Sequence, residues 1–308
     1  MKSIPKAILS ISIIFFISAQ NIQPAQMSTL SSAAKSNITG ELLRKGAGNF
    51  NYTASHNKQI PVWYYAPVEI NLNTPVLFVM HGVERNAQKY RDHWIKNAEK
   101  LKLLLLAPEF SQKFFPESNQ YNLGNMYSSI KHMNQNHRSE WSFSIIEDIF
   151  DYVRAHSVIR TDSYSIYGHS AGAQFVHRML LFVPEARIKT AIAANAGWYT
   201  MPSFDESFPY GLKGTGLTND QVEKAFKKKL IILLGEKDTD EKSENLRQTP
   251  ESIAQGRNRF ERGKAFFRIA KQSASAFKSQ FNWELNIVPG VGHNNSEMAR
   301  EAVYYLNY

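Results

Sequence analysis

The chain has 308 residues, no cysteine and a formal net charge of +9, and 43% of its residues are hydrophobic. This composition is typical of a globular protein and excludes a disordered, collagen-like or coiled-coil chain. The lack of cysteine excludes a disulfide framework, a cysteine-based zinc or iron–sulfur site and a thiol nucleophile. No nucleic-acid-binding motif accompanies the positive charge, so we expect no nucleic-acid partner.

The N-terminus predicts an export signal. Lys2 and Lys6 precede an apolar run over residues 7–19, which is shorter than the roughly 20 residues that a membrane-spanning helix needs. We interpret residues 1–26 as a signal peptide that is cleaved at about residues 19–26. The expected location is periplasmic or secreted, without stable membrane insertion after cleavage, and an uncleaved membrane anchor is the alternative.

Residues 27–47 are interpreted as a flexible lead-in, because they lack an apolar period and are rich in small and polar residues. Beyond them, residues 48–308 are predicted to form one domain in which apolar runs alternate with amphipathic stretches. In chain order, the pattern predicts strands at 60–66 and 75–82, a helix at 87–101, a strand at 103–107, a helix at 142–156, a strand at 164–167, a helix at 170–183, strands at 190–193 and 230–234, one or more helices within 252–279, a strand at 283–288 and a helix at 296–306.

The strand at 60–66 alternates in polarity and is rich in aromatic residues, so we expect an antiparallel edge strand there. The continuous apolar run at 75–82 is typical of a strand buried on both faces. Strands separated by helices of this length predict an α/β fold with a mostly parallel sheet and helices on both faces.

The strongest chemical motif is Gly-His-Ser-Ala-Gly at residues 168–172, a G-x-S-x-G sequence. It follows a predicted strand and opens a predicted helix, and a turn that sharp leaves no room for a Cβ at the flanking positions. Such a turn exposes the serine hydroxyl at the carboxyl edge of the sheet. Ser170 is therefore the predicted nucleophile.

A serine nucleophile needs a base, and the expected chain order is serine, acid, histidine. Asp238 follows the buried strand at 230–234 and is the predicted acid, with Asp240 as the alternative. His293 lies between the last strand and the last helix, after two glycines, and is the predicted base. An oxyanion hole would use the backbone N–H groups of Ala171 and of Val83, which follows the His-Gly pair after the strand at 75–82.

These four motifs, in this order, resemble the pattern of α/β-hydrolase-fold serine hydrolases over about residues 48–308. Within that superfamily the chain is similar to extracellular esterases of the polyhydroxyalkanoate depolymerase and feruloyl esterase kind. The resemblance implies an α/β-hydrolase fold and a reaction for which we expect no cofactor.

Two long segments, 110–140 and 194–218, follow strands at their carboxyl ends, where ligands bind in open α/β sheets. They are rich in aromatic residues, and Trp198 and Tyr199 lie in the segment that leaves the strand at 190–193, the strand just after the helix that follows Ser170. We therefore predict that both side chains line the substrate pocket. The histidines outside the predicted triad show no metal-ligand spacing with carboxylates, so no metal site is expected.

The sequence thus predicts an exported serine hydrolase that cleaves a small or polymeric carboxylic ester through an acyl-enzyme. Two alternatives stay open: a peptidase or amidase of the same fold, and a binding protein of the same fold without catalytic activity. The pattern does not determine the oligomeric state.

Overall fold

The computed structural model describes residues 42–306. The predicted signal peptide and most of the predicted lead-in lie outside the described residues. Among the described residues, no helix is both long and apolar enough to cross a membrane.

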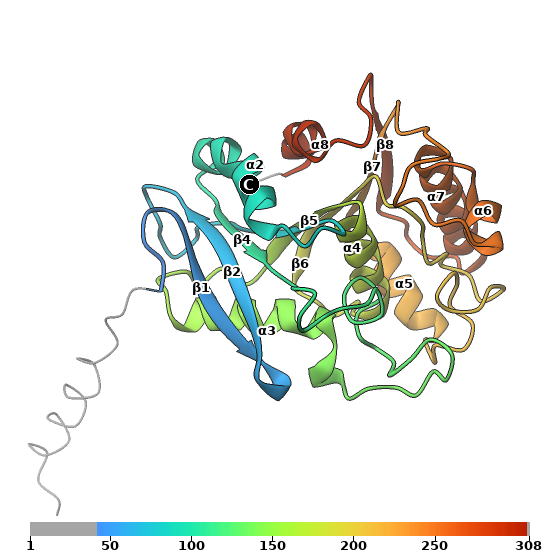
Figure 1. The fold of residues 1–308 in the computed structure, drawn as a ribbon, viewed down its shortest axis with the longest axis horizontal. Helices are drawn as coiled ribbons and strands as arrows, with labels where there is room; N and C mark the ends of the chain where they lie inside the picture. The colour runs from blue at the N-terminus through green and yellow to red at the C-terminus, as the bar shows by residue number, and fades with distance from the viewer. Residues whose placement is uncertain (1–41, 307–308) are drawn as a thin grey trace, which may run out of the picture. The chain divides into compact units, whose positions relative to one another are not determined.

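An eight-stranded sheet forms the centre of the structure (Figure 1), with the strand order β1-β2-β4-β3-β5-β6-β7-β8. The strands are β1 (Gly46–Ala54), β2 (Lys58–Ala66), β3 (Val76–Met80), β4 (Leu104–Pro108), β5 (Tyr164–His169), β6 (Ile188–Ala194), β7 (Leu230–Gly235) and β8 (Trp283–Val288). The hairpin of β1 and β2 is antiparallel and joins β4 in antiparallel register, whereas the six strands from β4 to β8 run parallel. The predicted α/β class and the mostly parallel sheet are confirmed.

Helices cover both faces of this sheet, as predicted. They are α2 (Ala87–Leu101), α3 (Ser142–Ala155), α4 (Ala171–Phe182), α5 (Asn219–Lys227), α6 (Pro250–Gln255), α7 (Arg259–Ala276) and α8 (Asn295–Ala302). Alternate strand residues divide the core: Phe78 packs with α3, α4 and α7 on one face, and Leu77 packs with α2 and α8 on the other. Because both faces are buried, the central strands are continuous apolar runs.

Three elements differ from the sequence prediction. Strand β1 was not predicted, because its glycines and asparagines hide the alternation, and it begins two residues inside the predicted lead-in. It pairs with all of β2, so the strand predicted at 60–66 is not at the edge of the sheet. The prediction of one or more helices at 252–279 is confirmed: α6, which begins two residues earlier, and α7 are separated at Gly256, which adopts a φ of 152°, and Asn258 caps the second helix. Helix α5 was not predicted, although Thr218 and Gln221 form a capping box at its start.

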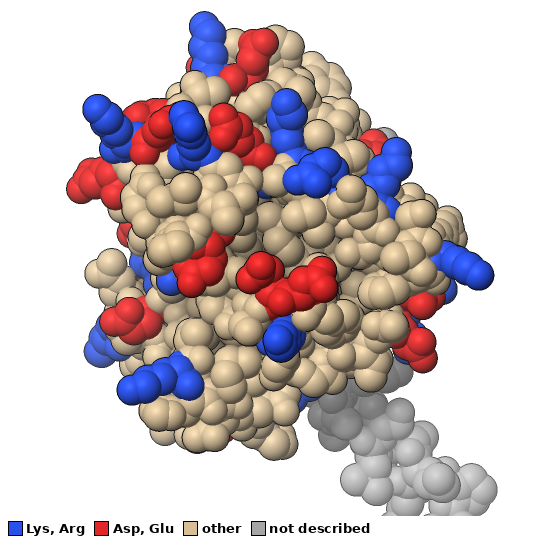
Figure 2. Space-filling view, turned by 90° about the vertical axis from the view of Figure 1, so that its right-hand side faces the viewer, with Lys and Arg blue, Asp and Glu red and all other residues tan. Residues whose placement is uncertain are grey.

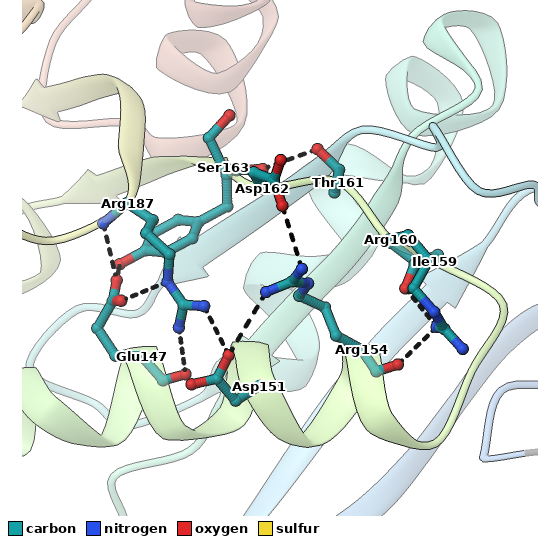
Figure 3. Close-up of polar contacts among 10 residues, drawn as sticks. Glu147, Asp151, Arg154, Ile159, Arg160, Thr161, Asp162, Ser163 and Arg187 are labelled. Atoms are coloured by element: carbon teal, nitrogen blue, oxygen red, sulfur yellow. Dashed lines mark hydrogen bonds and ion pairs between the residues drawn. The ribbon is translucent and has the colours of Figure 1, made fainter.

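Ion pairs fasten α3 to the start of β6 (Figure 3). Arg187 Nε lies 2.7 Å from Glu147 Oε2, and its Nη1 lies 2.6 Å from Asp151 Oδ1. The hydroxyl of Tyr164, the first residue of β5, also donates to Glu147. These contacts hold α3 at the amino ends of β5 and β6, away from the edge where β5 turns into α4.

Charged side chains of both signs are interspersed on the face drawn in Figure 2, which is the right-hand side of Figure 1. The net charge of +9 therefore does not gather into a single basic patch on that face.

Candidate active site

The turn from β5 into α4 has the strained geometry that the glycine pattern predicts. Ser170 adopts φ 58° and ψ −117°, a conformation that L-residues rarely take. A Cβ on Gly168 would lie 2.2 Å from the carbonyl oxygen of Gly172, and a Cβ on Gly172 would lie 2.1 Å from the carbonyl oxygen of Met80. Both positions must be glycine for the backbone to pass, and the turn places the serine hydroxyl at the carboxyl edge of the sheet.

Ser170, His293 and Asp238 form one hydrogen-bonded chain at that edge. His293 Nε2 lies 3.1 Å from Ser170 Oγ, and its Nδ1 lies 2.7 Å from Asp238 Oδ2. A carboxylate only accepts hydrogen bonds, so Nδ1 donates and Nε2 keeps the lone pair that faces the hydroxyl. The structure thus brings together the three residues that the sequence predicted, in a geometry in which an imidazole can take the serine proton.

The acid is buried and held on its second oxygen as well. Asp238 is 3% exposed, and its Oδ1 lies 3.5 Å from Nη1 of Arg259, the first residue of α7. The backbone N–H of Phe260 donates to the carbonyl of Asp238 at 3.2 Å. Asp240, the alternative acid, is exposed, and its Oδ1 accepts the N–H of Lys242 at 2.9 Å. Only Asp238 is in position to orient the histidine.

A second histidine packs on the first. The His169 ring lies 4.5 Å from the His293 ring, centroid to centroid, and its Nδ1 is 3.3 Å from the Tyr90 hydroxyl. Burial, and then the nearby His293, lower the pKa of His169 well below its ordinary value. His169 is therefore neutral and supports the His293 ring without adding a charge beside it.

The loop after β3 is held rigidly by buried polar contacts. His81 Nε2 accepts the N–H of Phe110 at 3.0 Å, so the other ring nitrogen carries the proton and donates to the carbonyl of Gly82 at 2.9 Å. Tyr121 stacks on the same ring at 4.6 Å and donates its hydroxyl to the His81 carbonyl at 2.7 Å. Burial lowers the pKa of His81 to about 3. The neutral His81 ring and the Tyr121 hydroxyl thus fix the backbone that leads to Val83 through hydrogen bonds.

Two cavities meet at Ser170 and share Val83 and Asn245 in their walls. The histidine-side cavity has a volume of about 420 Å³ and contains His93, His169 and His293. The Trp198 cavity has a volume of about 290 Å³ and contains Ala171, Gln174, Trp198 and Arg247. Each cavity therefore offers space beside the Ser170 hydroxyl for a different part of a substrate.

Comparison with known proteins shows the family. A poly(aspartic acid) hydrolase-1 from Sphingomonas sp. KT-1 is 42% identical, with a TM-score of 0.82 over 85% of this chain and 98% of that chain. A poly(3-hydroxybutyrate) depolymerase from Bordetella parapertussis is 33% identical, with a TM-score of 0.81 over 85% and 90%. The chain belongs to the α/β-hydrolase family of serine hydrolases. An S-formylglutathione hydrolase from Agrobacterium tumefaciens, 15% identical with a TM-score of 0.56 over 87% and 96%, shares the fold.

No protein-family model matches this α/β-hydrolase, and a search of curated proteins returns no match. The two solved structures of 42% and 33% identity confirm the predicted fold and family.

The two predicted pocket residues of this α/β-hydrolase have different positions. Trp198 lines the Trp198 cavity. Tyr199 was predicted to do the same, but it lines neither cavity at Ser170: its side chain is fully buried and stacks on Phe266 at 4.4 Å. The core encloses the Tyr199 ring instead, since His177 also packs against it, at 5.0 Å between ring centroids.

Sequence reasoning identified Asp238 in the loop at 236–249 but missed that Ser243, Asn245 and Arg247 of the same loop line the cavities. This loop has no aromatic residue, so the aromatic signal that predicted the pocket does not mark it; its position just after Asp238 was the usable signal. It also missed His93 and Asn295, whose side chains share a 2.7 Å hydrogen bond in the wall of the histidine-side cavity. Within residues 42–306, no group of three His, Asp or Glu side chains has the arrangement of a metal site.

Proposed function

We propose that this serine hydrolase cleaves carboxylic esters through an acyl-enzyme, with Ser170 as nucleophile, His293 as base and Asp238 as the residue that orients and stabilises His293. The observation that carries the proposal is the hydrogen-bonded chain of 3.1 Å and 2.7 Å that ends at the junction of two cavities.

In the first half-reaction, Ser170 Oγ bonds to the ester carbonyl carbon while its proton moves to His293 Nε2. The tetrahedral intermediate then collapses: the bond from carbon to the alcohol oxygen breaks, and the proton passes from Nε2 to that oxygen. In the second half-reaction water takes the place of the alcohol, and the acid is released with Ser170 restored. Asp238 accepts the Nδ1–H throughout and stabilises the imidazolium.

The negative charge of the tetrahedral oxygen would be held by the backbone N–H groups of Val83 and Ala171. Ala171 is the first residue of α4, so its N–H has no acceptor within the helix. Both residues line the Trp198 cavity beside Ser170. Loss of one such donor costs about 100–1000-fold in rate. The buried hydrogen bonds of His81 and Tyr121 would prevent this loss by holding the backbone before Val83 in place.

The test compares the wild type with Ser170→Ala on p-nitrophenyl esters of increasing acyl length. We expect the wild type to show turnover and a fluorophosphonate to label it, and we expect Ser170→Ala to lose about 10⁴-fold or more in kcat and all labelling. Ser275→Ala, an exposed serine on α7, is the matched control and should retain both. A wild type that neither turns over nor reacts with the phosphonate would instead support the non-catalytic binding protein.

Amide cleavage is the second candidate, because the chain is 42% identical to a protein named as a poly(aspartic acid) hydrolase. An ester and an amide with the same acyl group and matched leaving groups separate the two. A higher kcat/KM on the amide would overturn the ester proposal and leave the same three residues in the same roles.

We also propose, from the sequence alone, that the protein is exported by its N-terminal segment and acts on a small or polymeric substrate. Mass spectrometry of the N-terminus after expression in a bacterial host tests the first point. A mature protein that begins at Met1 would contradict it.

A further inference from the structure

Two guanidinium groups lie against the ring of Trp198: that of Arg247 in the wall of the Trp198 cavity, and that of Arg178 buried behind the wall. The guanidinium carbon of Arg178 lies 4.1 Å from the centroid of the Trp198 ring, and that of Arg247 lies 4.6 Å from the same centroid. Neither guanidinium has a carboxylate partner among residues 42–306. Glu244 also lines the cavity but is exposed. Two cations that share one aromatic ring without an acid are an unusual arrangement inside a protein.

Arg178 is the buried member of this pair. It is 0% exposed, and its donors reach only neutral acceptors: Thr200 Oγ1 at 2.8 Å, the Asn122 carbonyl at 3.1 Å and the Gln174 side chain at 3.3 Å. Its Nη2 is buried and has no hydrogen-bond partner within the described residues. Burial, and then the charge of Arg247, lower the pKa of Arg178 well below its ordinary value. An anion in the cavity would relieve this repulsion.

Arg247 lines the same cavity, and hydrogen bonds to its Nε and to its backbone carbonyl hold it in place. Its Nε donates to the Tyr210 hydroxyl at 2.7 Å. Its backbone carbonyl accepts hydrogen bonds from Arg262 Nη2 and Ser252 Oγ, each at 2.9 Å. Arg247 is thus half-buried and held through its Nε and its backbone carbonyl, and no carboxylate among residues 42–306 pairs with it. A planar guanidinium in this state matches the geometry of a carboxylate.

The position of His293 decides which half of a substrate meets this charge. In the proposed reaction the alcohol oxygen must receive a proton from His293 Nε2, so the alcohol half lies in the histidine-side cavity, which contains His293. The Trp198 cavity lacks His293 and lies on the Ala171 side of the nucleophile. The acyl half of the substrate therefore extends toward Arg247.

We propose that the Trp198 cavity is an acyl subsite that selects substrates whose acyl group ends in a carboxylate, with Arg247 as the residue that binds it. This inference rests on the proposed function, since it assigns the two halves of an ester to the two cavities. Arg178 adds positive potential to the subsite from within the protein.

The test uses two esters that differ only at the end of the acyl chain: mono-p-nitrophenyl adipate, which carries a carboxylate, and p-nitrophenyl hexanoate, which carries a methyl group. We expect the wild type to have the higher kcat/KM on the adipate. In Arg247→Met, the ratio of the adipate to the hexanoate value should fall by about 10–100-fold, because a charged hydrogen bond is lost. Arg247→Lys should lose less, since it keeps the charge but not the fork.

Arg268→Met is the matched control: it removes the same side chain from an exposed position on α7, and Arg268 lines neither cavity at Ser170. Its adipate-to-hexanoate ratio should equal that of the wild type. A carboxylate on the alcohol half, as in 4-carboxyphenyl hexanoate, should show no comparable dependence on Arg247. If kcat/KM for 4-carboxyphenyl hexanoate depends on Arg247 and kcat/KM for the adipate ester does not, the alcohol half occupies the Trp198 cavity and the proposal is wrong.

Each outcome is separable from failure of the proposed function. If the wild type hydrolyses both esters at similar rates and Arg247→Met leaves their ratio unchanged, the subsite is refuted while the ester hydrolase stands. If neither ester is cleaved and Ser170 does not react with a fluorophosphonate, the function itself fails. Competitive inhibition by adipate, measured against hexanoate cleavage, gives a second readout: its Ki should rise about 10-fold or more in Arg247→Met and should not change in Arg268→Met.

Discussion

Replacement of Gly172 by alanine should affect catalysis more than stability. The added Cβ would lie 2.1 Å from the carbonyl oxygen of Met80 and 2.9 Å from that of His81, both backbone atoms, whereas ordinary contacts begin at 3.4 Å. The start of α4 and the end of β3 must then move apart by roughly 1 Å. One of these segments carries Ser170 and the other leads to Val83, so the nucleophile and the proposed oxyanion donor separate.

A displacement of that size can cost about 100-fold in rate. Overpacking typically costs about 1–3 kcal/mol of stability, and part of this is offset because alanine is favoured over glycine within a helix by about 1 kcal/mol. We therefore expect kcat/KM on a p-nitrophenyl ester to fall about 100-fold in Gly172→Ala, while the melting temperature falls by only a few degrees.

Gly292→Ala is the matched control, because it lies beside His293 but has room for a side chain. The nearest atom to its added Cβ is the Lys237 carbonyl oxygen at 3.7 Å, and its backbone is not left-handed. This variant should stay within about threefold of the wild type, as expected for a change of less than 1 kcal/mol. Equal kcat/KM for Gly172→Ala and Gly292→Ala would refute the reasoning, because it would mean that the close approach at Gly172 does not position the reacting groups.

Two further predictions concern protonation. Asp238→Asn should lower kcat by about 10⁴-fold, since an amide can stabilise the wrong tautomer of His293, and Asp240→Asn should keep kcat within about twofold because its carboxylate only caps a turn; the reverse result would exchange the two roles. The free energy of unfolding should fall on acidification below pH 6.5, because burial lowers the folded-state pKa of His81 (to about 3), His169 and His177, so the unfolded chain binds these protons first. Each histidine contributes a slope of up to about 1.4 kcal/mol per pH unit, reached once the unfolded imidazole is fully protonated. Urea titrations between pH 6.5 and 5 should show an average slope that is smaller by about 1 kcal/mol per pH unit in His177→Gln. An equal slope in the two proteins would mean that burial of neutral His177 does not contribute to it.

Residues 168–172 and their strand–helix context were predictable because a backbone requirement determines them. Gly168 and Gly172 are glycines since a Cβ would meet backbone atoms that give way only if whole elements shift, and such a requirement leaves a mark in the sequence itself. The buried strands were predictable for a similar reason: both faces of the sheet are covered, so their residues are apolar without interruption.

The cavity walls were not predictable, because they depend on which loops meet in space. Trp198 and Tyr199 are adjacent aromatic residues, and only their surroundings in the fold decide that the first lines the cavity and the second lies in the core. Arg247 lies in a polar loop with no motif, and its importance depends on Trp198 and Arg178, which come from two other elements. Strand β1 escaped prediction because its partner β2, rather than its own composition, stabilises it.

The loop at 236–249 carries both the acid and the proposed specificity residue, so the two properties are physically coupled. The N-terminal turn of α7 contacts both Asp238 and Arg247. Arg259 Nη1 lies 3.5 Å from the Asp238 carboxylate, and Arg262 donates to the Arg247 carbonyl at 2.9 Å. A substitution in α7 that tilts this turn would move Asp238 and the proposed acyl subsite together. Changes of acyl specificity should therefore come most cleanly from the Arg247 side chain itself, since it lines the proposed subsite and its Nε bonds to the Tyr210 hydroxyl rather than to Asp238.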